Sequence, residues 1–329
     1  MTTLVCGGAG YIGSHAVAHL LDRGASVVVL DNLQKGHRRA VLDGAHFYEG
    51  DLRDESLLDK VFEENRIDDV LHFAADSLVG ESMEDPLRYY NNNVGGTIAL
   101  VDAMVRHGVK RIVFSSTAAV YGEPERIPVQ ESDSTIPTNT YGETKLTMEK
   151  MLKWVEKAHD INYTVLRYFN VAGADPKGRI GEDHNPETHL IPIVLEVAQG
   201  KREKIMIYGD DYPTPDGTCI RDYIHVTDLV TAHLAALERL EKGRGSAIFN
   251  LGNGEGFSVK EVIETARKVT ERDIPMEVAP RREGDPARLV ASSSLAMEEL
   301  EWKPAYSNLE QIIGTAWEWF ETHPDGYLK

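Results

Sequence analysis

Short apolar segments alternate with longer helix-like stretches through the first half of the chain. The apolar segments are continuous rather than interrupted by polar residues, as expected of strands that are buried on both faces. Strands that alternate with helices in this way predict a parallel sheet covered by helices on both sides. The predicted strands are residues 4–6, 27–30, 46–48, 70–73, 112–114 and 163–167, and the predicted helices lie near residues 12–23, 54–65, 86–107 and 142–158.

The second half of the chain has a looser pattern. After about Asn170, turn-rich loops such as residues 173–178 and 210–217 separate the elements. Helices are predicted at residues 189–199, 227–241, 258–270 and 307–321, and short strands at 205–208, 248–251 and 277–279. We therefore predict an α/β fold. A doubly wound parallel sheet covers residues 1–170, with residues 221–242 returning to it, and a second, smaller mixed α/β domain covers residues 171–329.

Composition and charge narrow the class of protein. The 35 Lys and Arg residues against 53 Asp and Glu residues give a net charge of −18, and so acidic a surface repels the phosphate backbone of a nucleic acid. No apolar run approaches the ~18 residues that cross a bilayer, and the N-terminal stretch has no signal-peptide pattern. The two distant cysteines, Cys6 and Cys219, fit the reducing cytoplasm.

A glycine-rich turn joins the first predicted strand to the first predicted helix. Gly7, Gly10 and Gly13 have the spacing of a dinucleotide-binding fingerprint, in which glycines let the backbone approach a pyrophosphate at the start of a helix. The next strand ends in Asp31, which is placed to accept hydrogen bonds from the adenine ribose and to repel a 2′-phosphate. The pattern therefore predicts NAD rather than NADP as the cofactor.

Tyr141 and Lys145 lie four residues apart on a predicted helix and so share one face. A phenol with a pKa near ~10 is a poor base at neutral pH. We expect the Lys145 ammonium and a positive nicotinamide ring to lower the pKa of Tyr141. The fifth strand runs into Ser115 and Thr117, at the carboxyl end where open α/β sheets bind ligands. Thr117 is placed to relay a proton to Tyr141.

These motifs and several later ones resemble the UDP-glucose 4-epimerases of the extended short-chain dehydrogenase/reductase family. The matching stretches include residues 7–13, 114–122, 141–145 and 167–170, and further on residues 209–218, 221–226 and 279–285. The similarity covers nearly the whole chain. It implies an isomerase of carbohydrate and galactose metabolism that oxidises carbon 4 of a UDP-hexose to a ketone with bound NAD and reduces it again on the opposite face. UDP-glucose and UDP-galactose are the expected substrates, with N-acetylated UDP-hexoses as further candidates.

The resemblance also implies roles for individual residues. The first domain would bind NAD and the second the UDP-sugar. Beside Gly7, Gly10, Gly13, Asp31, Tyr141 and Lys145, the cofactor residues would be Tyr11, Ile12, Asn32, Lys35, Gly36, Asp51, Leu52, Phe73, Ala74, Ala75, Ser77, Asn92, Ser115 and Phe169. The substrate residues would be Thr117, Asn170, His189, Leu190, Tyr208, Arg221, Arg282, Asp285 and Leu289. Arginines suit the diphosphate, and Tyr208 is placed to pack against uracil.

The chain departs from the family pattern at three places. The family usually has Ser where this chain has Thr117, which keeps the hydroxyl. Its usual Lys near the sugar is replaced within residues 75–78, and Leu289 stands where many members have Tyr. Because Leu is smaller, we expect room for the bulkier N-acetylated hexoses.

Other functions fit the sequence less well. A dehydratase of the same fold needs carboxylates after the catalytic Thr, where this chain has Ala118 and Ala119. An enzyme that acts on uronic acids stays open as an alternative function. A non-catalytic NAD-sensing protein is less favoured, because it would not need the Tyr141/Lys145 pair. Histidines such as His184 and His189 lack a ligand spacing of the His-Glu-x-x-His type, so no metal site is predicted. By resemblance, helices near 86–107 and 142–158 would pair in a homodimer.

Overall fold

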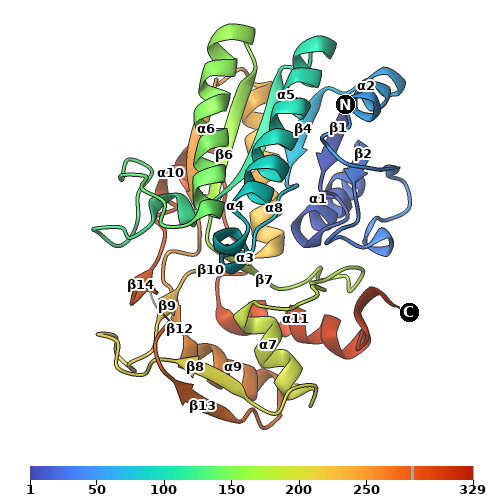
Figure 1. Cartoon of the computed structure of the whole chain (residues 1–329). Coiled ribbons are helices and arrows are strands. Elements are labelled where there is room, and N and C mark those ends of the chain that lie inside the picture. Colours follow the sequence, from blue (N-terminus) through green and yellow to red (C-terminus); the bar gives the residue numbers. More distant parts are fainter. Residues whose placement is uncertain (283–284, 329) are drawn as a thin grey trace.

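A seven-stranded parallel sheet forms the larger part of the computed structural model, which describes residues 1–282 and 285–328. The strand order is β11-β6-β5-β4-β1-β2-β3, so the chain winds outward in both directions from β1 and β4 (Figure 1). The predicted doubly wound α/β fold is therefore confirmed. The strands are β1 (Thr2–Cys6), β2 (Ser26–Asp31), β3 (His46–Glu49), β4 (Asp69–His72), β5 (Arg111–Thr117), β6 (Asn162–Tyr168) and β11 (Ala247–Leu251).

Helices cover both faces of this sheet. Successive side chains along each strand point alternately into the helix layer on one face and the helix layer on the other. Val5 and Val29 point into a core with α1 (Tyr11–Asp22), α8 (Val226–Glu241) and α10 (Ser294–Glu299). Leu4 and Leu30 point into the opposite core with α2 (Glu55–Glu64), α5 (Gly96–His107) and α6 (Thr140–His159). The uniformly apolar strands follow from this burial on two sides.

The predicted helix at 86–107 is helical throughout but is not one regular α-helix. A π-helical turn over Tyr90–Gly95 separates α4 (Pro86–Tyr89) from α5. A short helix that the sequence did not predict, α3 (Val79–Glu84), precedes them. Its six residues are too few for the apolar periodicity on which helix prediction depends.

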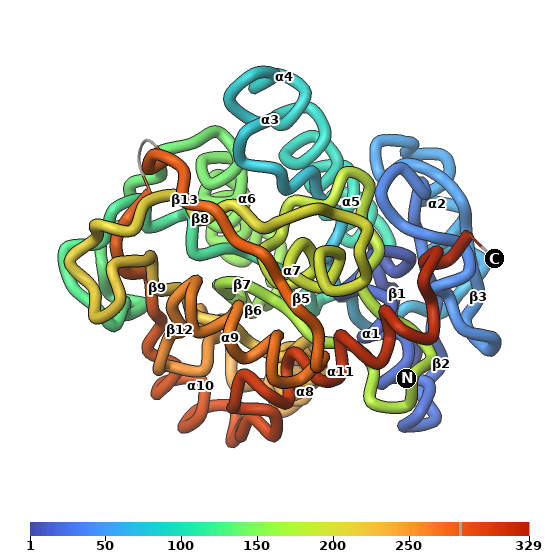
Figure 2. Tube along the Cα trace, turned by 90° about the horizontal axis from the view of Figure 1, so that it is seen from below, coloured from blue at the N-terminus to red at the C-terminus, as the bar shows by residue number. Residues whose placement is uncertain are grey.

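The smaller part lies below the carboxyl edge of the large sheet (Figures 1 and 2). Its core is formed by α7 (Leu190–Ala198), α9 (Val259–Thr270), α11 (Leu309–Thr322) and β8 (Ile205–Tyr208). The largely exposed β13 (Met276–Ala279) pairs in parallel with β8. Short strands connect the smaller part to the sheet above: β7 (Asn170–Ala172) pairs with β10 (Tyr223–His225), and β9 (Ile220–Arg221) lies between β12 (Phe257–Ser258) and β14 (Arg288–Leu289).

The sequence placed the strand at 248–251 in the smaller domain, and this placement is wrong. In the structure β11 pairs in parallel with β6 and completes the large sheet, while Ala296 of α10 packs in the same core. A five-residue strand carries no local signal of its pairing partner, because that partner lies about 80 residues earlier in the chain. The domain boundary near residue 170 stays a prediction.

Candidate functional site

The glycine turn after β1 packs so tightly that side chains would not fit. Gly7 has a φ of +81°, and its N–H donates a hydrogen bond to the Leu30 carbonyl at 2.9 Å. A Cβ atom on Gly13 would lie 2.0 Å from the Gly7 carbonyl oxygen, and one on Gly36 would lie 2.7 Å from the Ala9 backbone. The turn, the first turn of α1 and the segment after β2 therefore approach one another at backbone distance.

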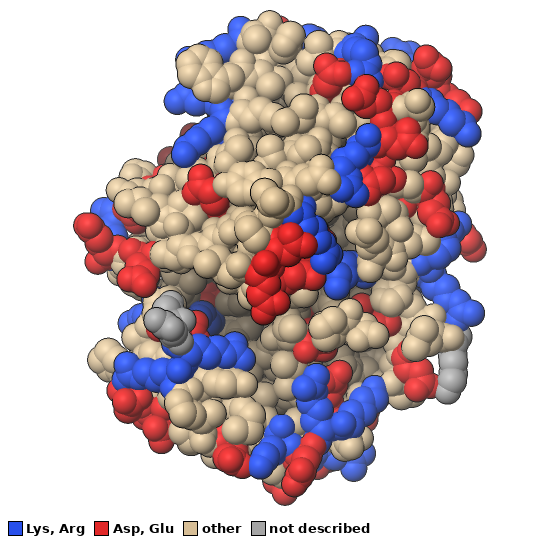
Figure 3. Space-filling view, viewed as in Figure 1, with Lys and Arg blue, Asp and Glu red and all other residues tan. Residues whose placement is uncertain are grey.

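A cleft opens beside this turn, at the carboxyl ends of β1, β2, β3 and β4. Figure 3 shows the surface hollowed between the upper and lower parts of the molecule, with Lys and Arg side chains on the margin. Predicted cofactor residues line much of the cleft, joined by four that the sequence did not single out. The lining is Gly7, Gly10, Leu30, Asp31, Asn32, Gln34, Lys35, Gly36, Gly50, Asp51, Leu52, Phe73, Ala74, Ala75, Asp76 and Asn92.

The unpredicted lining residues are Leu30, Gln34, Gly50 and Asp76. Each lies at or shortly after the end of a strand of the large sheet, so position relative to the strands was the signal that could have found them. Ser77, a predicted cofactor residue, is exposed.

Asp31 is held rigidly at the end of β2. Its carboxylate accepts hydrogen bonds from the N–H groups of Ala9 and Leu33, at 2.9 and 2.8 Å. Burial raises the pKa of this carboxyl, and the two backbone hydrogen bonds act in the opposite direction. The carboxylate therefore joins the glycine turn to the segment after β2 on the wall of the cleft.

Helix α6 brings the predicted catalytic pair to the carboxyl end of β5. Asn139 caps the helix by accepting a hydrogen bond from the Gly142 N–H at 2.9 Å. Lys145 is 3% exposed, and its Nζ donates to the Ser115 carbonyl at 2.8 Å. The same Nζ lies 5.9 Å from the centroid of the Tyr141 ring. The two side chains thus share one face of the helix.

Burial dominates the electrostatics of this pair. It raises the pKa of the Tyr141 phenol to about 12, against a smaller lowering by a hydrogen bond with Thr117. It lowers the pKa of Lys145 to about 7, and the negative charge of Glu149 acts in the opposite direction. Lys145 alone therefore does not lower the pKa of Tyr141 in the way that the sequence led us to expect. This lowering requires a further positive charge beside the phenol.

Other predicted cofactor residues contact α8, the loop after β7 and two core clusters. Ser115 is buried, and its hydroxyl lies 2.9 Å from Nε2 of His233 on α8. The Tyr11 hydroxyl donates to the Gly173 carbonyl at 2.6 Å and so links α1 to the loop after β7. Ile12 packs against the core beneath the glycine turn, and Phe169 packs beside a smaller core cluster.

The predicted substrate residues fall into several groups below the sheet. Arg221 and Asp285 form an ion pair at 3.0 Å, so the structure brings two of the predicted substrate residues together. The Arg282 guanidinium lies 3.8 Å from the centroid of the Tyr208 ring. The Asn170 side chain donates to the Asp222 carbonyl at 3.0 Å. The intervening motif residues 283 and 284 lie outside the described residues.

His189 and Leu190 mark the start of α7, where His189 is the N-cap residue. Leu289 lies on β14, paired with Arg221 of β9. Its side chain is half-buried and, like Phe169, packs against the cluster of Val120, Tyr121, Val129 and Leu146. Leu289 therefore bridges the core near Thr117 and the loops of the smaller part.

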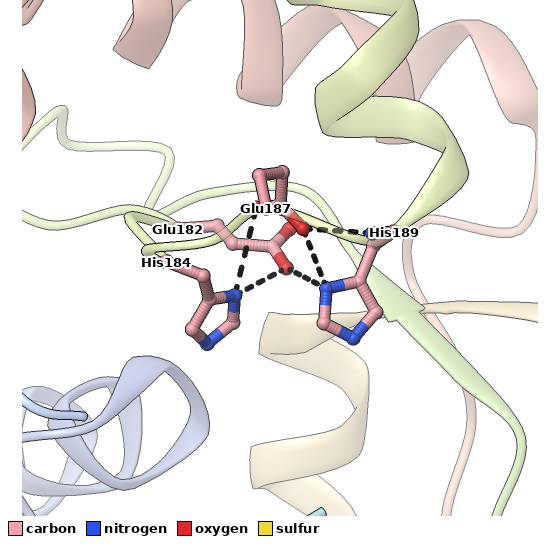
Figure 4. Close-up of side chains that lie close together, drawn as sticks. All are labelled: Glu182, His184, Glu187 and His189. Carbon is pink, nitrogen blue, oxygen red and sulfur yellow. Dashed lines mark hydrogen bonds and ion pairs between the residues drawn. The ribbon is translucent and has the colours of Figure 1, made fainter. Parts of the chain in front are cut away.

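Four side chains with metal-binding chemistry converge on the loop before α7, although the sequence predicted no metal site. They are Glu182, His184, Glu187 and His189 (Figure 4). Sequence reasoning missed them because their spacing matches no helical ligand motif, and only the path of the loop brings them together.

Among the described residues, no helix has both the length and the apolar composition required to cross a bilayer. Cys6 and Cys219 are both free and buried.

Comparison with known proteins gives consistent matches. Residues 3–252 match the NAD dependent epimerase/dehydratase family. The chain is 62% identical over 327 residues to a UDP-glucose 4-epimerase of Halalkalibacterium halodurans, covering 99% of this chain and 98% of that protein. A crystal structure of a UDP-glucose 4-epimerase superposes with a TM-score of 0.99 at 60% identity, with both chains fully covered. A UDP-glucose 4-epimerase from Bifidobacterium longum in complex with NAD+ and UDP is 40% identical, with a TM-score of 0.93 and coverage of 99% and 100%.

The packing of the glycine turn predicts a selective effect of one added methyl group. Gly13→Ala should sharply reduce the NAD content of the purified protein, because the methyl would force the turn away from α1. Gly314→Ala, in the middle of α11, is the matched control: nothing lies within 4 Å of its added Cβ, so cofactor content should be unchanged. Absorbance and chromatography of the released nucleotide measure this content. Equal NAD content in the two variants would contradict the prediction.

Proposed function

Because the chain belongs to the NAD dependent epimerase/dehydratase family, we propose that it is an NAD-dependent 4-epimerase that interconverts UDP-glucose and UDP-galactose. The observation that carries the proposal is the placement of Tyr141 and Lys145 beside Thr117 at the carboxyl end of β5, next to the glycine-lined cleft. A hydroxyl relay, a phenol and an ammonium in one place suit proton removal from a sugar hydroxyl while a hydride leaves the same carbon.

The cleft fits NAD in two respects. The glycine turn leaves the backbone N–H groups at the start of α1 without a side-chain cap, and such N–H groups bind a pyrophosphate. The Asp31 carboxylate on the wall suits ribose hydroxyls and disfavours a 2′-phosphate. Bound NAD supplies a ring carbon that accepts a hydride from the sugar and returns it. Its positive charge also favours the Tyr141 phenolate, which burial alone disfavours.

Each catalytic residue of the site would have a separate role. Tyr141 would take the proton of the 4′-hydroxyl through Thr117 and return it after the keto sugar has turned over. Lys145 would hold the nicotinamide ribose and stabilise the phenolate. The position of Lys145 supports this, because its Nζ lies 5.9 Å from the centroid of the Tyr141 ring, on the same face of α6.

The UDP part of the substrate would be held by the smaller domain while the hexose turns. Arg221 and Arg282 suit the diphosphate, and Asp285 suits the uridine ribose. Tyr208 would pack against uracil. The ion pair between Arg221 and Asp285 would open or share its hydrogen bonds with the ligand. His189 and Leu190 at the start of α7 would lie near the phosphates, and Asn170 would complete the pocket.

The structure gives no support to a dehydratase. That reaction requires an acid and a base that remove water after oxidation, directly after Thr117. Ala118 and Ala119 occupy these positions, and Ala118 is buried. Neither can transfer a proton.

A homodimer and a cytoplasmic location complete the proposal. Apolar side chains lie exposed on the outer surface of α4, α5 and α6, including Leu87, Ile98 and Trp154. Two copies of this surface would form a four-helix bundle around a two-fold axis. Val101, also on α5, is buried within the chain and is not part of this surface. The two free, buried cysteines suit a reducing compartment.

Tyr141→Phe tests the mechanism. The variant should fold and retain NAD but lower kcat by roughly 10²–10⁴-fold, because it lacks the proton acceptor. Tyr306→Phe is the control, since that ring stacks on His225 and does not line the cleft. Purified enzyme is incubated with UDP-galactose, and the products are separated by chromatography. Near-normal turnover by Tyr141→Phe would reject the assignment, and net reduction of NAD would show an ordinary dehydrogenase.

Leu289→Tyr tests the choice of sugar. We expect the unmodified enzyme to convert UDP-galactose well and UDP-N-acetylglucosamine more slowly. The larger ring should selectively suppress the N-acetyl reaction, since the keto sugar must turn within the space that Leu289 leaves. Initial rates with both substrates measure the ratio. An equal loss on both would instead indicate a packing role beside Phe169, and no N-acetyl turnover by the unmodified enzyme would contradict the open cavity.

Leu87→Glu tests the dimer surface. Light scattering at micromolar concentration should give a dimer for the unmodified protein and a monomer for this variant, because two buried charges would face each other across the axis. Val278→Glu, on an exposed strand of the smaller domain, should remain dimeric. A monomeric unmodified protein would reject the proposal.

A further inference from the structure

The loop before α7 carries two glutamates and two histidines whose polar atoms face one another. Glu182, His184, Glu187 and His189 each offer one ligand atom, and these four atoms lie within 4.8 Å of one another. In Figure 4, both imidazole rings direct Nδ1 toward the two carboxylates. The cluster lies beside the glycine turn, since the His184 ring meets the Tyr11 ring edge-on at 6.1 Å. It is separate from the proposed catalytic residues on α6.

The nitrogen–oxygen separations in this cluster are close to the distances between neighbouring ligands of a small metal ion. His184 Nδ1 lies 3.2 Å from a Glu182 oxygen and 3.6 Å from a Glu187 oxygen. His189 Nδ1 lies 3.3 and 2.8 Å from oxygens of the same two carboxylates. A tetrahedral zinc ion with ligands at ~2.0–2.1 Å separates its ligand atoms by about 3.4 Å. The four nitrogen–oxygen separations lie within about 0.6 Å of this value. The widest separation in the cluster, at most 4.8 Å, shortens by up to about 1.4 Å when an ion binds.

The surroundings favour a cation at this point. Both carboxylates are only 5% exposed, so two negative charges are brought together largely out of water. Glu187 is held in place by the backbone N–H groups of Thr188 and His189, both at 2.7 Å. Such outer hydrogen bonds orient the ligands of metal sites. Nδ1 of His184 is buried and has no well-aligned hydrogen-bond acceptor among the described residues, although it faces the cluster.

We propose that Glu182, His184, Glu187 and His189 form a binding site for one divalent transition-metal ion of the zinc class. Two imidazole nitrogens and two carboxylate oxygens suit zinc, whereas calcium and magnesium prefer six or more oxygen ligands. Four protein ligands leave no open position, so the ion is structural. It ties the start of α7 to the loop that contacts Tyr11 and leaves Nε2 of His189 available to other partners.

Zinc titration of the purified full-length protein, after chelator treatment and desalting, tests the site. Calorimetry should show one Zn²⁺ bound per chain, and Co²⁺ should give the visible absorption of tetrahedral coordination. Mg²⁺ should not compete. His184→Gln and Glu182→Gln should each weaken Zn²⁺ binding by at least about 100-fold, since each removes a direct ligand. His46→Gln, an exposed histidine that pairs with Asn65, should bind as the unmodified protein does.

Thermal unfolding supplies a second readout that does not depend on activity. Added Zn²⁺ should raise the Tm of the unmodified protein and of His46→Gln, and leave those of His184→Gln and Glu182→Gln unchanged. Circular dichroism without metal checks that the variants fold. An absence of Zn²⁺ binding would show that the cluster is held by protonated imidazoles alone and would overturn the proposal. Binding that both ligand variants retain would overturn it equally.

Discussion

A buried ion pair between Glu149 of α6 and Arg167 of β6 holds the proposed catalytic helix against the sheet. Both side chains are at most 5% exposed, and Arg167 donates to the two carboxylate oxygens at 3.1 and 2.6 Å. The same carboxylate accepts a hydrogen bond from Ser116 of β5. Breaking such a pair typically costs ~3–5 kcal/mol, because the remaining charge is left buried and unpaired. Tyr141 and Lys145 lie on the same helix face, two turns and one turn earlier, so the pair fixes their position relative to β5.

The cofactor cleft depends on a second constraint, the close approach of the backbone around Gly7, Gly13 and Gly36. Parallel strands end at one edge of the sheet, so the glycine turn, Asp31 and the end of β5 all open toward the same space. The smaller part of the chain lies across that edge. Under the proposed function, this arrangement lets the smaller part hold the nucleotide while the sugar turns at the carboxyl edge of the sheet.

Features that depend on local spacing could be predicted from the sequence. Features that depend on contacts between distant segments could not. The glycine turn and the Tyr141/Lys145 pair were recognisable because each lies within a few residues of one strand or helix. The position of β11 was not, since its partner β6 is far away in the sequence. Glu149 and Arg167 resemble ordinary solvated charges until the fold buries them together. The Glu/His cluster at 182–189 depends on the path of an irregular loop, which carries no periodicity.

The fate of the hydrogen on carbon 4 of the hexose is the most direct test of transient oxidation. UDP-galactose that carries deuterium at this carbon is incubated with the enzyme in ordinary water, and the UDP-glucose formed is analysed by mass spectrometry and NMR. Because the same hydrogen leaves and returns within one site, the product should retain the full deuterium label at carbon 4. Loss of the label to water would contradict the account, since it would show that the hydrogen leaves as a proton that exchanges with solvent.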